Sequence, residues 1–249
     1  MSRVNLIKGG FSNCYLIAEE EALILVDVGS SNEVEEIVSH VNKSAPKEKY
    51  SVLVFSTHFH IDHVAGISYL LDTLPGTEVA FYRKVNDFLS RKEKICIPRI
   101  GSWFGRLPPV YLKSDRHIPS LLELREDDKV GIPLPWLRRR VSVRYEVSLW
   151  LKDGDRLPCA PDWKIISSPG HTTDSVCLWH EKEAILISGD TIINMDGTGE
   201  LNPFCCNYAQ EKQSFDKLTG SINVKSLYPG HGHPVTFGND LLSKVKILK

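Results

Sequence analysis

Short apolar runs, separated by polar turns, recur along most of the chain. Each run is about four to eight residues long, which fits a strand of a buried sheet better than a helix. The first two runs flank the acidic turn Glu19-Glu20-Glu21, and the third precedes a histidine-rich stretch. We therefore predict strands at 13–17, 22–26, 51–55, 77–82, 146–151, 163–167, 175–179, 184–187 and 226–228.

Three other segments have the spacing of helices. Residues 32–42 repeat apolar side chains every three or four positions, as an amphipathic helix does. Similar patterns cover 64–74, which runs into Pro75-Gly76, and 208–218. Both halves of the chain thus consist of strands followed by a helix, without a tandem repeat.

One long segment, 83–145, breaks this pattern. It is rich in proline and aromatic residues and contains fifteen Lys and Arg against seven Asp and Glu, a net charge of +8. The rest of the chain carries −9. Such a basic insert could fold over a site as a lid and steer an anionic substrate towards it. The alternatives are a dimer interface or a solvated loop, so a homo-oligomer stays open.

The overall composition is that of an ordinary soluble globular protein. The chain has 249 residues, 42% of them hydrophobic and 24% charged, with a net charge of −1 that indicates no polyanionic partner. No apolar run approaches the roughly 20 residues of a transmembrane segment, and the first residues lack the pattern of a signal peptide. We therefore expect a cytoplasmic protein. Its six cysteines show no Cys-x-x-Cys spacing, so we expect reduced thiols.

The strongest chemical signal is the run Thr57-His58-Phe59-His60-Ile61-Asp62-His63, which follows the predicted strand at 51–55. Crowded imidazoles oppose one another's protonation, whereas a divalent metal takes neutral imidazole nitrogens and carboxylate oxygens as ligands. The run therefore predicts a metal site. The alternative is a polar loop that happens to be rich in histidine.

Three more predicted strands end in the same way, with a glycine turn and then a residue that can bind a metal. These residues are His171 after Pro169-Gly170, Asp190 after Ser188-Gly189, and His231 after Pro229-Gly230. Glycine allows a sharp turn that presents the next side chain at the end of the strand. Together with the first run they supply five histidines and two carboxylates, which suits two metal ions.

This ordered set of motifs resembles the metallo-β-lactamase superfamily. The matching motifs are Thr-His-x-His-x-Asp-His at 57–63, Pro-Gly-His-Thr at 169–172, Ser-Gly-Asp-Thr at 188–191 and Pro-Gly-His-Gly at 229–232. Residues 13–17 and 26–29 also look like that family's opening strands. The resemblance implies an α+β protein with the four-layer αββα sandwich of that fold. It also implies a single domain over 1–249, with the basic insert at about 83–145.

The resemblance further implies how the ligands are divided. His58, His60 and His171 would hold one divalent ion, while Asp62, His63 and His231 would hold the other. Asp190 would bridge the two. A bridging aspartate is typical of the glyoxalase II, lactonase and ribonuclease Z branches and unlike true β-lactamases, although residues 192–199 do not settle the subfamily. Zinc is the expected metal, with iron and manganese as alternatives.

The activity implied is hydrolysis at a dinuclear metal site, with a metal-bridging hydroxide that attacks the carbonyl of an ester, thioester or lactone. Asp62 and Asp190 are the predicted catalytic residues. The substrate would be a small, anionic molecule. A phosphodiesterase or nuclease using the same site is one alternative, motivated by the basic insert, although nucleic acid is not the favoured partner. An iron-loaded oxidoreductase is the other alternative.

A few further residues are weaker candidates. Asp27 could steady the histidine run through hydrogen bonds, or it could be an ordinary turn residue at the end of a strand. Tyr208 lies where some lactonase relatives place a tyrosine that contacts substrate, and His117 lies in the insert, where loops often determine specificity. We expect His40 and His180 at the surface.

Overall fold

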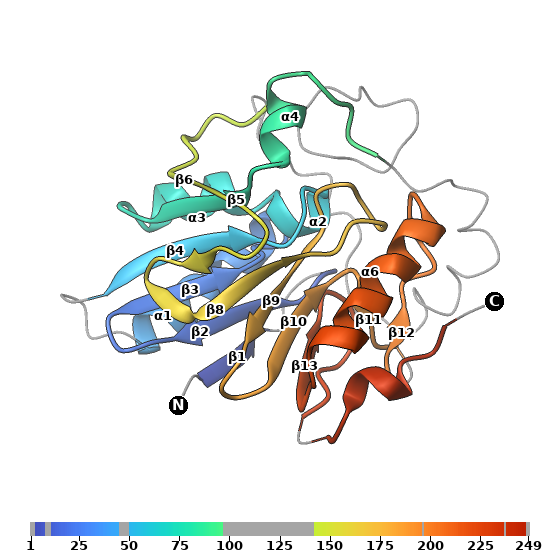
Figure 1. Ribbon diagram of the computed structural model, residues 1–249. Coiled ribbons are helices and arrows are strands. Elements are labelled where there is room, and N and C mark those ends of the chain that lie inside the picture. The colour runs from blue at the N-terminus through green and yellow to red at the C-terminus, as the bar shows by residue number, and fades with distance from the viewer. Residues whose placement is uncertain are drawn as a thin grey trace.

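The computed structural model describes residues 3–7, 11–44, 50–96, 142–195, 197–236 and 238–247. Two β-sheets face each other in the centre of these residues, and helices cover the outer side of each sheet (Figure 1). Within the described residues, no helix combines the length and the apolar character needed to cross a bilayer.

The first sheet takes its strands in chain order, and it turns from antiparallel to parallel. β1 to β3 pair antiparallel, whereas β3, β4, β5 and β6 pair parallel. The polypeptide therefore has to cross over between later strands, and the crossovers carry α1, α2 and α3. The six strands are β1 (Arg3–Ile7), β2 (Cys14–Ala18), β3 (Ala22–Val26), β4 (Ser51–Ser56), β5 (Glu78–Tyr82) and β6 (Leu149–Leu151).

The second sheet has the order β13-β10-β9-β8-β7. Only β10 and β13 pair parallel, and the other neighbours are antiparallel. A short hairpin of β11 (Ile192–Ile193) and β12 (Glu200–Leu201) follows β10. The sheet strands are β7 (Arg156–Leu157), β8 (Ala160–Ser167), β9 (Val176–His180), β10 (Ile185–Gly189) and β13 (Ser226–Pro229).

Helices close the two outer faces. The turn η1 (Ser31–Glu33) leads into α1 (Val34–Ser44), and α2 (Ile61–Val64) is followed by α3 (Ile67–Thr73). These helices contribute to the apolar cluster on the outer face of the first sheet, as does α4 (Val85–Leu89). On the second sheet that role falls to α6 (Tyr208–Ser221) and η4 (Leu241–Lys244).

Three apolar layers hold the four structural layers together. In β2, Tyr15 and Ile17 pack into the layer between the sheets, whereas Cys14 and Leu16 pack under the helices. Side chains of a strand alternate between its two faces, so a strand covered on both sides must be apolar throughout. This explains the continuous apolar runs in the sequence. The predicted α+β class and the four-layer sandwich are confirmed.

The predicted helix at 64–74 is wrong in one respect, because the chain forms two short helices instead of one. The break falls at Ala65–Gly66, where backbone groups pair with a different part of the chain. The amide of Gly66 donates to Gly29 O at 2.9 Å, and the amide of Val28 donates to His63 O at 2.9 Å. β1 and α4 were missed by the sequence analysis. Most of the insert, 97–141, lies outside the described residues, so its role as a lid stays a prediction.

The expectation of six reduced cysteines is also wrong. Cys96 and Cys206 form a disulfide, with their Cα atoms 6.3 Å apart, while Cys14, Cys159, Cys177 and Cys205 are free. The partners are separated by 110 positions in the sequence. Only the fold brings them together, so cysteine spacing could not have predicted this pairing.

Candidate metal centre

Four loops meet at one edge of the two sheets, each at the carboxyl end of a strand. The loop after β4 carries the histidine run, and the loops after β8, β10 and β13 carry one residue each. Their donor atoms form three overlapping groups, within each of which the atoms lie no more than 4.8 Å apart. The groups are His58, His60 and His171; His58, His63 and Asp190; and Asp62, His63 and His231.

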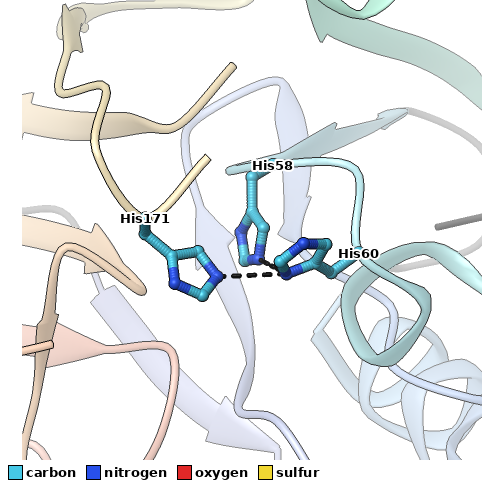
Figure 2. A group of neighbouring side chains, drawn as sticks. All are labelled: His58, His60 and His171. Atoms are coloured by element: carbon cyan, nitrogen blue, oxygen red, sulfur yellow. Dashed lines mark hydrogen bonds between the residues drawn. The ribbon is translucent and has the colours of Figure 1, made fainter. Parts of the chain in front are cut away.

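Three histidines form the first group (Figure 2). His60 Nδ1 lies 3.1 Å from His58 Nε2 and 3.0 Å from His171 Nε2. Nitrogens bound tetrahedrally to one zinc ion would be about 3.3 Å apart, given Zn–N distances of about 2.0–2.1 Å. The three nitrogens are therefore already close to the spacing that a shared metal ion needs.

Asp190 lies between histidines of the first group and histidines of the third group. Its Oδ2 atom is 3.4 Å from His171 Nε2 and 3.3 Å from His231 Nε2, while its Oδ1 atom is 3.4 Å from His63 Nε2. One carboxylate therefore faces ligands that come from three different loops. The backbone of the β13 loop comes so close that a Cβ atom on Gly230 would collide with this carboxylate.

Asp62 and His231 complete the other side of the cluster. Asp62 Oδ2 lies 3.3 Å from His231 Nε2 and 3.7 Å from His63 Nε2. Asn13 holds the His231 turn in place, because its side-chain amide donates to Pro229 O at 2.8 Å and to Gly232 O at 2.7 Å. Asn13, the residue before β2, thus positions a loop that lies more than 200 residues later.

Backbone carbonyls orient three of the five histidines. A carbonyl oxygen can only accept, so the ring nitrogen facing it must carry the proton, and the other nitrogen keeps its lone pair. In each case the free nitrogen is the one that faces the cluster. The three bonds run from His60 Nε2 to Cys96 O at 3.2 Å, from His171 Nδ1 to Phe204 O at 2.6 Å, and from His231 Nδ1 to Phe11 O at 3.0 Å.

Asp27 and Thr57 orient the other two histidines. His63 Nδ1 donates to Asp27 Oδ2 at 2.8 Å, and the Thr57 hydroxyl donates to the same oxygen at 2.8 Å. Because that hydroxyl has given its only proton to Asp27, it accepts from His58 Nδ1 at 3.2 Å. Asp27 is 1% exposed and has a left-handed backbone, φ 60°, at the end of β3. In all five histidines, one ring nitrogen is thus held by an acceptor and the other is turned towards the cluster.

Among the described residues, two buried polar atoms of the cluster have no hydrogen-bond partner: His63 Nε2 and Asp190 Oδ1, which face each other at 3.4 Å. Leaving such groups unpaired in a protein interior is costly, and a metal ion would satisfy both. Imidazole nitrogens and carboxylate oxygens are donors that zinc, iron and manganese all accept. The residues present thus fit divalent metal ions.

The two sides of the cluster differ in charge. Burial, with the neighbouring histidines, holds the pKa of His58 well below its usual value, and burial lowers the pKa of His171 to about 4. Burial also acts on His231, but Asp190 and Asp62 outweigh it and raise its pKa to about 10. Metal ions would meet neutral rings at His58 and His171, whereas they would displace a proton from His231.

Replacing Asp27 by asparagine is expected to weaken divalent metal binding about 10- to 100-fold. An asparagine has only one acceptor oxygen where Asp27 has two, so it cannot hold His63, Thr57 and Ser56 as the carboxylate does. Competition with a chromophoric chelator measures the change in affinity.

Asp162→Asn is the matched control. It makes the same chemical change on β8, where Asp162 forms an exposed pair with Lys182. Its metal affinity should equal that of the unmodified protein. Equal affinities for all three proteins would show that Asp27 does not orient a ligand.

The weaker candidates have different outcomes. Tyr208 is the first residue of α6 and is 38% exposed, so its contact with substrate stays a prediction. His117 lies outside the described residues. His40 bonds to Glu36 O on the exposed side of α1. The surface prediction for His180 is wrong: it is 3% exposed, because its ring packs edge-on against Trp163 between neighbouring strands, with ring centroids 5.0 Å apart.

The sequence analysis missed the carbonyls that orient His60, His171 and His231. A carbonyl group is present at every residue, so no motif could mark these three. It also missed Glu211, a fully buried carboxyl on α6 that lies beneath the turn before His171. Its only signal was an acidic residue on the face of α6 that carries Phe215 and Leu218 into the core.

Comparison with known proteins agrees with this geometry. Residues 7–245 match the model of the metallo-β-lactamase superfamily. A β-lactamase-like protein 2 homolog of Caenorhabditis elegans is 27% identical over 221 residues, which cover 89% of this chain and 56% of that protein. The chain thus spans little more than half the length of this relative. The probable metallo-hydrolase YflN of Bacillus subtilis is 23% identical over 249 residues, covering 92% of this chain and 83% of that protein.

Solved structures share the fold. The crystal structure of BLEG-1 B3 metallo-β-lactamase superposes with a TM-score of 0.59 at 18% identity, over 98% of this chain and 100% of that one. At such an identity, the likeness shows the fold and not the substrate. The family model covers nearly the whole chain and the ligand loops lie at one edge of a four-layer sandwich, so this chain belongs to the metallo-β-lactamase superfamily.

Proposed function

We propose that the chain is a dinuclear metal-dependent hydrolase that cleaves an ester, thioester or lactone. One observation carries the proposal: five histidines and two aspartates from four loops present their free donor atoms to a common space, with Asp190 between the two groups. The name of the B. subtilis relative, a probable metallo-hydrolase, supports the same class.

In this proposal His58, His60 and His171 hold one ion, Asp62, His63 and His231 hold the second, and Asp190 bridges them. Bound divalent ions would lower the pKa of water from about 16 to about 7 and polarise a substrate carbonyl. Zinc is the proposed metal, with iron or manganese as alternatives.

The protein's own contribution is to fix donors and to orient a water molecule. Burial would raise the pKa of Asp62, but His63 and His231 lower it to about 2. Asp62 therefore stays ionised at neutral pH, so it accepts a hydrogen bond from an attacking water rather than holding its proton. The acceptors behind each ring, such as Asp27 behind His63, keep the donors from rotating out of position.

The proposed substrate is a small anionic molecule. At the described start of the basic insert, a cavity of about 510 Å³ is lined by Arg83, Lys84 and Lys92 together with Lys152 and Trp150. Lys84 is paired with Asp87 at 3.0 Å and with Glu93 at 2.5 Å, so its charge is largely balanced. The other cations support attraction of an anion.

Metal content and substrate class can be tested together. After expression with added zinc, iron or manganese, elemental analysis should give about two ions per chain. The loaded protein should hydrolyse some of a panel of p-nitrophenyl esters, acyl thioesters and lactones, and a chelator should abolish that activity. Bis-p-nitrophenyl phosphate and RNA form the comparison arm for a phosphodiesterase.

Each outcome separates the alternatives. Substantially less than one ion per chain after metal-replete expression would remove the proposal. Turnover of the phosphodiesters alone would replace it by a phosphodiesterase that uses the same site. Oxygen consumption by iron-loaded protein, with no activity in the zinc form, would replace it by an oxidoreductase.

A further inference from the structure

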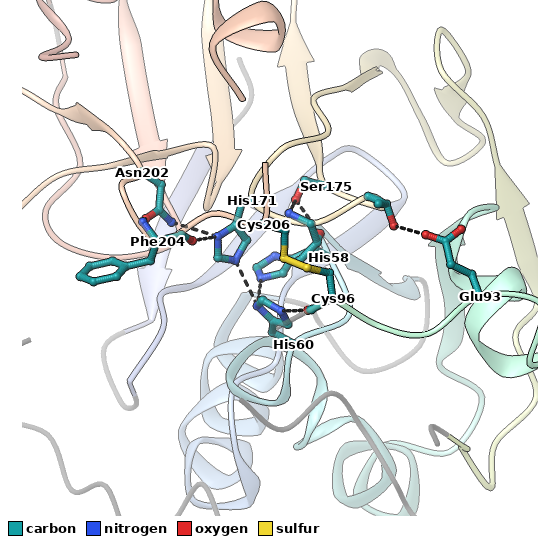
Figure 3. Close-up of a disulfide and its surroundings, with 11 residues drawn as sticks. His58, His60, Glu93, Cys96, His171, Ser175, Asn202, Phe204 and Cys206 are labelled. Carbon is teal, nitrogen blue, oxygen red and sulfur yellow. Dashed lines mark hydrogen bonds between the residues drawn. A yellow bond between two sulfur atoms is a disulfide. The ribbon is translucent and has the colours of Figure 1, made fainter. Parts of the chain in front are cut away.

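The Cys96–Cys206 disulfide lies beside the three-histidine group (Figure 3). Cys96 ends the described segment that follows α4, and Cys206 lies just before α6. Both cysteines are half-buried rather than fully enclosed. The disulfide joins two segments that belong to different sheets and that both contact histidines of the cluster.

On the Cys96 side, the contact is to His60. The Cys96 carbonyl accepts the Nε2 proton of His60 at 3.2 Å, which leaves Nδ1 free for the cluster. On the same segment, Glu93 accepts a hydrogen bond from Thr173 at 3.0 Å, two residues past His171. The segment that contains Glu93 and Cys96 therefore connects the first sheet with the His171 loop of the second sheet.

On the Cys206 side, the contacts are to the His171 loop. The amide of Cys206 donates to Gly170 O at 3.0 Å and to His171 O at 3.1 Å. Two residues earlier, the Phe204 carbonyl accepts the Nδ1 proton of His171 at 2.6 Å. The disulfide thus ties the acceptor that orients His60 to the short segment that orients His171.

We propose that Cys96–Cys206 is a reversible, redox-controlled tether that sets the metal affinity of the His58, His60 and His171 group. The inference rests on the metal site of the proposed function. When the bond is closed, the carbonyls of Cys96 and Phe204 are held at a fixed separation, so the two donor nitrogens stay aligned. When it is open, Cys96 is freed from Cys206, and His60 loses the fixed acceptor of its Nε2 proton.

A dithiol reductant can open the bond by thiol–disulfide exchange. A thiolate of the reductant attacks one of the two sulfurs, the Cys96–Cys206 bond breaks, and a mixed disulfide forms. The second thiol of the reductant then displaces the protein sulfur. The reductant leaves as a disulfide after giving two electrons and two protons, and the protein keeps two thiols.

Core packing also holds the chain next to this bond. Ile95, next to Cys96, is 3% exposed and packs into the layer under the first sheet, which keeps the segment in place up to that residue. Burial raises the pKa of the adjacent free thiol, Cys205, to about 11, so this thiol is a poor nucleophile towards the neighbouring disulfide. The change on reduction is therefore confined to Cys96 and the segment before α6.

Thiol counting comes first. Denatured protein that has not seen a reductant should contain four reactive thiols, and six after reduction. In Cys205→Ser protein the counts should be three and five, which assigns the bond to Cys206 and not to its neighbour. Six thiols without reductant would overturn the proposal.

Zinc affinity is then measured by competition with a chromophoric chelator. Two samples of metal-free protein are titrated, one oxidised and one reduced with a phosphine. The phosphine is removed under anaerobic conditions before the titration. Reduction should weaken one of the two zinc equivalents at least tenfold and leave the other unchanged. Cys96→Ser and Cys206→Ser should show the weak value under both conditions, because neither changes a backbone group.

Cys205→Ser is the matched control, since it makes the same change at the next residue. It should bind zinc like the unmodified protein and should still respond to reduction. A cross-link that only stabilises the fold would lower the unfolding midpoint of metal-free protein when it is opened, but it would leave the zinc constants unchanged. Equal constants for oxidised and reduced protein therefore overturn the inference while the metal site stands. If no form binds zinc, the proposed function fails as well.

Discussion

Replacing Asp190 by asparagine is expected to reduce hydrolysis on the order of a thousandfold or more and to lower the metal content. Asp190 lies within 3.4 Å of donor nitrogens on His63, His171 and His231, so it faces both proposed ligand groups. An amide of the same shape carries no charge to offset two divalent ions. It would also turn an NH₂ group towards one of the histidines. A loss of about 4 kcal/mol of transition-state stabilisation corresponds to about a thousandfold in rate.

The measurement is kcat/KM on the best substrate of the panel, with elemental analysis of the same preparation. Asp216→Asn is the matched control, because Asp216 is an exposed carboxylate on α6 and belongs to none of the three donor groups. It should keep both activity and metal. An Asp190→Asn protein that keeps two ions and nearly full activity would contradict the bridging role.

Replacing Glu211 by glutamine is expected to stabilise the fold, and to do so more strongly as the pH rises. The Glu211 side chain is fully buried, and neither of its carboxyl oxygens has a hydrogen-bond partner among the described residues. Burial raises its pKa from an ordinary 4.5 to about 9. A glutamine has nearly the same shape but never carries the charge that this environment disfavours.

The direction follows from proton binding. The folded chain holds the Glu211 proton up to about pH 9, whereas the unfolded chain releases it near 4.5, so stability falls as the pH rises between these values. The slope is at most about 1.4 kcal/mol per pH unit. Between pH 5.5 and 8 the unmodified protein should therefore lose up to about 3 kcal/mol through this group, and Glu211→Gln should not lose it.

Urea unfolding of metal-free protein at pH 5.5 and 8 measures this difference. Glu181→Gln is the control, since Glu181 is exposed and paired with Arg156 at 3.6 Å. Its effect should be small and the same at both pH values. If Glu211→Gln changes stability equally at pH 5.5 and 8, the carboxyl is not buried in its neutral form.

The same carboxyl explains a glycine in the ligand loop. Gly170 has a φ of +148°, and a Cβ atom there would collide with the Glu211 carboxyl and with the backbone of α6. The turn before His171 is therefore pressed against the first turn of α6. Glycine is needed at this position because any Cβ atom would collide with Glu211 and because the backbone has a positive φ.

Much of the framework was predictable from the sequence, because each layer leaves its own pattern. The strands β2, β3, β4 and β10 are buried on both faces, and this forces uninterrupted apolar runs. The side chains of the site directly follow the carboxyl ends of strands. Their positions in the sequence therefore predict that they gather at one edge of the sheets. His171 and His231 were found by their glycine turns for this reason.

The parts that could not be predicted depend on contacts between distant residues. The disulfide joins Cys96 to Cys206 across the sandwich, and spacing carries no information about it. The helix after the histidine run breaks because Gly66 pairs with Gly29, a contact that helical periodicity cannot reveal. His180 is buried by Trp163, which belongs to the neighbouring strand.

The hold of Asn13 on the His231 turn has a consequence for the order in which the site is assembled. The His58, His60 and His171 group needs residues up to Cys206, because Phe204 and Cys206 hold the His171 loop. The Asp62, His63 and His231 group must wait for residues 229–232 to dock on Asn13, through bonds that span 216 and 219 positions. During synthesis the residues of the first group are therefore available before those of the second, which only the last strand of the second sheet completes.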